Sequence, residues 1–244
     1  MFKRFFLAGL MLAFGSSAMA ATPMHTAHKP PKKPAHTPMH AAAKLSPKPA
    51  GAEIAFVTAV QADLMKRFAT AKDAEAAGYV RFGNEDKSGS ISYANRQWNS
   101  ADPQHPSQLW YDVNGNLLGA DFSVVKTATG PAGPPALWGV NPARWLNFKH
   151  PHVHWILKDP KTGTLSYGAT SGKKFAAAGG DVENPTAATV VKLGKAKDAA
   201  DVVSVFEFPA LWDLQVWVKP NPNGAFAEMN PNVKPSKDAA KDDM

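Results

Sequence analysis

Three histidines at alternate positions, His150, His152 and His154, form the densest cluster of metal-ligand side chains after residue 50. In a β-strand, alternate side chains point to the same face, so the three imidazoles would share one face. Imidazole nitrogen is a common ligand of zinc and copper in proteins. The pattern therefore predicts a site for a transition-metal ion, copper or zinc, on a strand over residues 149–158.

The spacing limits how many of these imidazoles one ion can bind. Same-face neighbours on a strand lie roughly 7 Å apart, so His150 and His154 would be about twice as far from each other. Pro151 has no backbone N–H for a ladder, which places His150 at an edge or at the start of the strand. We therefore expect His152 and His154 to be the main ligands, with His150 in a supporting role.

A further ligand would have to come from another part of the chain. His105, in a loop between two prolines, is the one other histidine after residue 50, and Glu207 and Asp213 lie on two later predicted strands. Histidines and carboxylates both complete the coordination shells of zinc sites. Each of these residues also has a simpler explanation as a polar loop or cross-strand group, and the three alternating histidines could form a solvated strand face.

Most motifs for nucleophilic catalysis are absent from the sequence. The chain has no cysteine, no Gly-x-Ser-x-Gly, no His-Glu-x-x-His and no standard glycine-rich phosphate loop. An enzyme of this sequence would have to use the metal ion, as cupin-like oxygenases do, or a zinc-bound water. Whether the protein is an enzyme stays open, and metal binding for sequestration or delivery is the preferred hypothesis.

Residues 1–20 have the three parts of a secretory signal peptide. Lys3 and Arg4 precede an apolar run over residues 5–14, and Ala18-Met19-Ala20 has the small residues of a cleavage site. This run is shorter than the roughly 18 apolar residues that a spanning helix needs, and no later segment approaches that length. We expect export to the periplasm or the medium, and no membrane-spanning segment in the mature protein.

Residues 21–50 have the composition of a disordered tether, rich in proline, lysine, alanine and histidine. Seven of the 27 basic residues lie in residues 1–50, which contain no acidic residue, so 20 basic and 20 acidic residues remain after them. The folded part is thus formally neutral, which argues against a nucleic-acid-binding domain. A basic tether favours anionic envelope surfaces, and a non-metal envelope-binding module is the main alternative function.

The chain after residue 50 changes from a helical to a strand pattern. Apolar residues recur at three- and four-residue spacing from Ile54 to Phe68, which predicts one amphipathic helix over residues 52–77, and Gly78 follows as a C-terminal cap. Asn114-Gly115 predicts a type I′ hairpin turn. Strands are predicted over residues 79–82, 91–95, 109–113, 116–125, 149–158, 164–167, 202–208 and 211–219, with a short helix over residues 185–193.

These elements predict one domain over residues 51–233. Its fold class would be mainly β, an antiparallel β-sandwich or open barrel with one N-terminal amphipathic helix. Residues 234–244 are highly charged and would form a frayed tail.

Several segments resemble a family of uncharacterised exported bacterial proteins. The most specific of them is N-P-x-G-x-F-x-x-x-N-P over residues 221–231, within a match that covers about residues 75–233. The resemblance implies an exported, β-rich protein and implies no activity. Members of the family carry histidines where this chain has Ser92 and Gln215, so a family site would be lost here or replaced by the cluster at residues 150–154.

Overall fold

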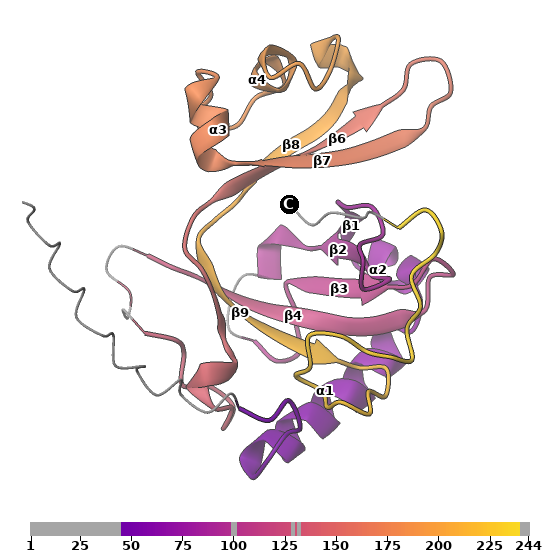
Figure 1. Cartoon of the computed structure of the whole chain (residues 1–244), viewed down its shortest axis with the longest axis vertical. Coiled ribbons are helices and arrows are strands. Elements are labelled where there is room, and N and C mark those ends of the chain that lie inside the picture. The colour runs from indigo at the N-terminus through magenta and orange to yellow at the C-terminus, as the bar shows by residue number, and fades with distance from the viewer. Residues whose placement is uncertain (1–44, 99–101, 128–129, 131–132, 240–244) are drawn as a thin grey trace, which may run out of the picture. The chain divides into compact units, whose positions relative to one another are not determined.

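The computed structural model describes residues 45–98, 102–127, 130 and 133–239 (Figure 1). The predicted signal peptide, most of the predicted tether and the last five residues lie outside the described residues. No helix in the described part of the chain is long and apolar enough to cross a membrane. Antiparallel strands dominate over helices, which confirms the predicted fold class.

The described strands form two antiparallel sheets. The larger sheet contains, in spatial order, β1 (Val80–Arg81), β2 (Ile91–Ala94), β3 (Gln108–Tyr111), β4 (Leu117–Val125), β9 (Leu211–Trp217) and β5 (Leu146–Phe148). The smaller sheet contains β7 (Leu165–Ser171), β6 (His152–Lys158) and β8 (Val202–Phe208). Both sheets have free edge strands, so neither closes into a barrel.

Two neighbouring chain segments pass from the larger sheet to the smaller one. Strand β5 pairs with β9 in the larger sheet, and β6 pairs with β8 in the smaller sheet. Figure 1 shows β8 and β9 as one bent ribbon. Pro151 and Pro209 have no backbone N–H to donate to a neighbouring strand, so strand pairing stops on both segments at the bend. The strand predicted from residue 149 therefore begins only at His152.

Helix α1 (Ala52–Arg67) covers one face of the larger sheet, as its apolar spacing predicts. Its buried side chains share one core with alternate residues of the strands: Phe56, Val57, Val60 and Leu64 from the helix, and Leu109, Tyr111, Ala120, Phe122, Leu214 and Val216 from the sheet. Ile54, which the spacing places on the apolar face, is instead 55% exposed. The opposite face of the same strands carries polar residues together with the indoles of Trp110 and Trp217.

The predicted helix over residues 52–77 is two helices. Helix α1 ends at Arg67, and Thr70 begins the short helix α2 (Ala71–Ala76). The Thr70 hydroxyl accepts a hydrogen bond from Asp73 N, and the Asp73 carboxylate accepts one from Thr70 N. This reciprocal cap stabilises a new start in place of a continuous helix. Gly78, with a φ of 85°, ends α2 as predicted.

The hairpin between β3 and β4 is confirmed, but its predicted turn type is wrong. Gly115 has a φ of 80°, whereas Asn114 does not have the positive φ that a type I′ turn requires. Gly115 N donates to Asp112 O at 2.9 Å, and the Asp112 carboxylate accepts from Asn116 N. The Asp112 side chain therefore selects a longer turn in which glycine alone takes the left-handed conformation.

The smaller sheet is covered on one face by α3 (Gly172–Ala177) and α4 (Ala187–Lys192). Val153 and Trp155 point to this face and pack with Phe175 and Val190. Helix α4 lies within the predicted range of residues 185–193, whereas α3 was not predicted. Because side chains alternate along β6, the histidines leave the sheet on the other face.

Both ends of the described chain pack onto the domain outside residues 51–233. Phe226 N donates to Pro47 O at 3.0 Å, so part of the predicted tether is folded against the body. Ser236 N donates to Glu85 Oε1 at 2.7 Å, within the segment predicted as a frayed tail. The ordered unit therefore starts before residue 51 and continues past residue 233.

Candidate functional site

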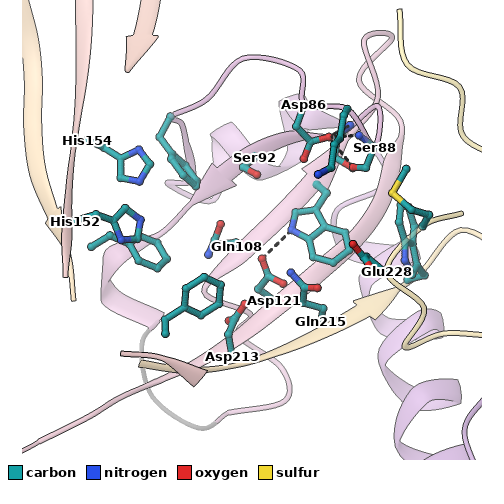
Figure 2. A pocket seen from close by; sticks show the side chains of 18 residues that line it. Asp86, Ser88, Ser92, Gln108, Asp121, His152, His154, Asp213, Gln215 and Glu228 are labelled. Carbon is teal, nitrogen blue, oxygen red and sulfur yellow. Dashed lines mark hydrogen bonds between the residues drawn. The ribbon is translucent and has the colours of Figure 1, made fainter. Parts of the chain in front are cut away.

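A cavity of about 320 Å³ lies between the polar face of the larger sheet and the histidine face of the smaller one. Figure 2 shows His152 and His154 on one wall, Asp121 and Asp213 on the opposite side, and Gln108 between them. Loop residues complete the rim. The lining side chains are Phe82, Asp86, Lys87, Ser88, Ser90, Ser92, Gln108, Trp110, Asp121, Phe148, His152, His154, Phe208, Asp213, Gln215, Trp217, Glu228 and Met229.

Strand alternation places the two histidines next to each other in this cavity. His152 and His154 are separated by one residue on β6, and their ring centroids are 4.9 Å apart. Phe208 stacks on His152, and Phe206 stacks on His154. Phe82 meets His154 edge to face at 5.1 Å. The aromatic side chains hold both imidazoles in place and shield them from solvent.

Burial keeps both imidazoles neutral at neutral pH. It lowers the pKa of His154 to about 3, with a smaller contribution from His152, because the charged ring loses its hydration. Burial also lowers the pKa of His152, against the opposing effect of a hydrogen bond to the His150 backbone. The Nε2 atom of His154 is buried and has no hydrogen-bond partner among the described residues. A neutral imidazole with a free nitrogen is the form that binds metals.

The opposite wall carries two buried carboxyl groups. Asp121 on β4 and Asp213 on β9 are 4% and 2% exposed. Trp110 Nε1 donates to Asp121 Oδ2 at 2.8 Å, and the Ser123 hydroxyl donates to Asp213 Oδ1 at 2.8 Å. Asp121 Oδ1 is buried without a hydrogen-bond partner of ordinary length in the described chain.

Burial makes both carboxyl groups hard to ionise. Burial first, and then the negative charge of Asp213, raise the pKa of Asp121 well above its ordinary value. Burial raises the pKa of Asp213 to about 7, although the bond from Ser123 acts in the opposite direction. Two neighbouring carboxyl groups that are shielded from water cannot both ionise without a large free-energy cost. The pair therefore retains a proton close to neutral pH.

A glycine brings the Trp110 indole close to the floor of the cavity. Trp110 and Gly119 are cross-strand partners on β3 and β4. A Cβ atom at Gly119 would lie 2.5 Å from the indole and 2.7 Å from Val216 O, closer than atoms can approach. The absence of a side chain at residue 119 therefore lets Trp110 lie against β4 and reach Asp121.

The structure brings together part of the predicted metal-ligand set. His152, His154 and Asp213 line the cavity, whereas His150 is exposed at the bend and does not. His105 Nδ1 lies 2.7 Å from Asp102 Oδ2, and its ring stacks on Trp98, away from the cavity. Among the described residues, no three His, Cys, Asp or Glu side chains are grouped closely enough to hold one ion.

Glu207 also lies outside the cavity wall. It pairs with Val153 in the register of β6 and β8, and Val153 points to the helix-covered face. Asp121 and Gln108 were missed by the sequence reasoning. A signal was present, because Asp121 is a charged residue inside the otherwise apolar and small-residue run of β4.

Comparisons with models of known protein families, with curated proteins and with solved structures find no match for this chain. The cavity itself must therefore carry the functional argument. Ser92 and Gln215 both line it.

Proposed function

We propose that the protein binds a transition-metal ion, zinc or copper, through His152 and His154. The observation that carries this proposal is the buried Nε2 atom of His154, which has no partner in the described chain and stands beside a second neutral imidazole. An unpaired buried polar atom costs free energy that coordination of a metal would recover. Acidic residues on the rim and floor, including Asp86 and Glu228, favour a cation.

The proposed site supplies two nitrogen ligands and leaves other coordination positions open. Structural zinc sites have four protein ligands, whereas sites that exchange their ligands keep open positions. Asp213 or Asp121 would have to approach from the opposite wall to become a third ligand. An open site of this kind suits sequestration or delivery of a metal ion better than permanent retention.

Titration of the mature protein with zinc and copper salts, in competition with a chelator, tests the proposal. Replacing His152 and His154 together by alanine should remove one site, with a loss of affinity of at least about tenfold, because both protein ligands disappear. The metal content of the purified protein should fall in parallel.

His150→Ala and His105→Ala are the matched controls, because neither side chain lines the cavity. Both variants should retain the site. Equal metal binding by the wild type and the double variant would place any bound metal on other histidines, such as those of residues 21–50, and would refute the proposal.

We also propose that residues 1–20 direct export and that the basic segment after them lies near anionic envelope surfaces. Its support is compositional, because a charged start, a short apolar run and an A-x-A site are followed by a segment without acidic residues. Mass spectrometry of the exported protein should give an N-terminus at Ala21. Recovery of the uncleaved chain from the cytoplasm alone would contradict export.

A further inference from the structure

The floor of the cavity contains hydrogen-bonding groups that the protein does not use. Gln108 is only 7% exposed, and its side-chain amide makes no hydrogen bond to the described residues. Asp121 Oδ1, beside it on the paired strand, is also buried and has no hydrogen-bond partner of ordinary length among the described residues. A bound molecule that supplied partners to these groups would gain free energy of binding there.

Rigid aromatic surfaces flank these polar groups. The indoles of Trp110 and Trp217 meet edge to face with centroids 5.5 Å apart. Each indole N–H is already engaged, Trp110 with Asp121 and Trp217 with Ala227 O, so both rings are fixed in orientation. Phe148 stands at the rim and is partly exposed. Aromatic faces beside planar polar groups suit a molecule with both apolar C–H faces and a ring of polar groups.

The polar groups on the cavity floor determine which kind of small molecule can bind there. An anion would meet the carboxyl groups of Asp121, Asp213 and Glu228. An ammonium ion can donate hydrogen bonds but accepts none, so the two donors on each amide of Gln108 and Gln215 would stay unpaired. A hydroxyl group both donates and accepts, and it can pair with amides and with carboxyl groups.

We propose that the cavity floor is a binding site for a neutral sugar ring, whose hydroxyl groups bond Gln108, Gln215 and the Asp121–Asp213 pair while one face packs on an indole. The site goes beyond the proposed metal function and does not depend on it. A larger cavity of about 1310 Å³ shares Phe148, Gln215, Glu228 and Met229 with the first one. A saccharide of more than one unit can therefore extend from the floor towards residues 45–48.

Ligand-observed NMR with the full mature chain tests this site. The probes are D-glucose, N-acetyl-D-glucosamine and their β-1,4-linked disaccharides, with methylammonium chloride as the cationic alternative. At least one sugar should show saturable binding and should change the tryptophan fluorescence. Gln108→Ala and Gln215→Ala should each weaken that binding about tenfold, because a buried hydrogen-bond partner is lost.

The control variants separate this proposal from the metal site and from misfolding. Gln104→Ala, at an exposed loop position, should bind the sugar as the wild type does. The wild type should bind the sugar equally with and without a metal chelator, because the site does not depend on the metal. Gln215 is only half-buried, so its variant still reports if Gln108→Ala fails to fold. No saturable binding of any sugar, binding of methylammonium alone, or equal weakening in Gln104→Ala would overturn the proposal.

Discussion

Replacing Asp213 by asparagine should stabilise the domain at pH 8. In the folded protein, burial raises the pKa of Asp213 from 3.8 to about 7. The unfolded chain releases this proton above about pH 4, whereas the folded chain holds it until about pH 7. The aspartate therefore lowers stability progressively between pH 4 and pH 7, by an amount on the order of 4 kcal/mol.

Asparagine removes this cost while its side-chain oxygen can still accept the hydrogen bond from Ser123. Urea unfolding followed by tryptophan fluorescence should give a gain of about 3–4 kcal/mol at pH 8 and little difference at pH 4. Comparing variant and wild type at each pH cancels the contribution of His154, whose lowered pKa has the opposite effect. Asp238→Asn, at an exposed position, should change neither value. A variant that is no more stable than the wild type at pH 8 would contradict the raised pKa of Asp213.

Breaking the ion pair between Arg144 and Glu53 should destabilise the protein strongly. The guanidinium donates to both carboxylate oxygens of Glu53, at 3.0 and 2.9 Å, and the two side chains are 6% and 5% exposed. Glu53 also accepts hydrogen bonds from Ala50 N and Asn141 N, so it ties the start of α1 to the loop before β5. Arg144→Met leaves Glu53 buried without its cation and should cost about 3–5 kcal/mol in the free energy of unfolding.

The surface pair of Arg67 and Asp63 provides the control for this prediction. It also joins an arginine to a carboxylate, one helical turn apart, but its side chains are about one-third exposed. Arg67→Met should therefore cost less than about 1 kcal/mol. In a Glu53→Gln/Arg144→Met double variant, the loss should be smaller than the sum of the two single losses, because each single change leaves one buried partner unpaired. Additive losses would show that the pair does not act as a unit.

The contribution of the Arg144–Glu53 ion pair to stability should decrease as the pH is lowered and Glu53 is protonated. The hydrogen bond from Arg144, more than the opposing effect of burial, lowers the pKa of Glu53 below 4.5. A carboxyl group with a lowered pKa stabilises the fold above its unfolded pKa, and this contribution is lost as the pH falls through the folded value. The Arg144→Met variant should therefore differ most from the wild type above pH 4.5.

The periodicity of the sequence correctly predicted features that depend on residues close together in the chain. The three- and four-residue apolar spacing after residue 52 located the face of α1 that packs on the sheet, because a helix repeats every 3.6 residues. The alternation of His152 and His154 correctly placed both imidazoles on one strand face. Where a side chain competes locally, as Thr70 and Asp112 do, the same reasoning gave a helix that was too long and the wrong turn type.

The composition and spacing of the sequence alone thus determined a mainly β chain and a pair of neighbouring histidines on one strand. Only the tertiary structure decided what faces them. The bend at Pro151 removed His150 from the strand, His105 paired with Asp102 in a distant loop, and Asp121 and Gln108 came to lie on the opposite wall. Those positions depend on the register between β3, β4 and β9 and on the packing of two sheets, which are non-local pairings that no sequence period encodes.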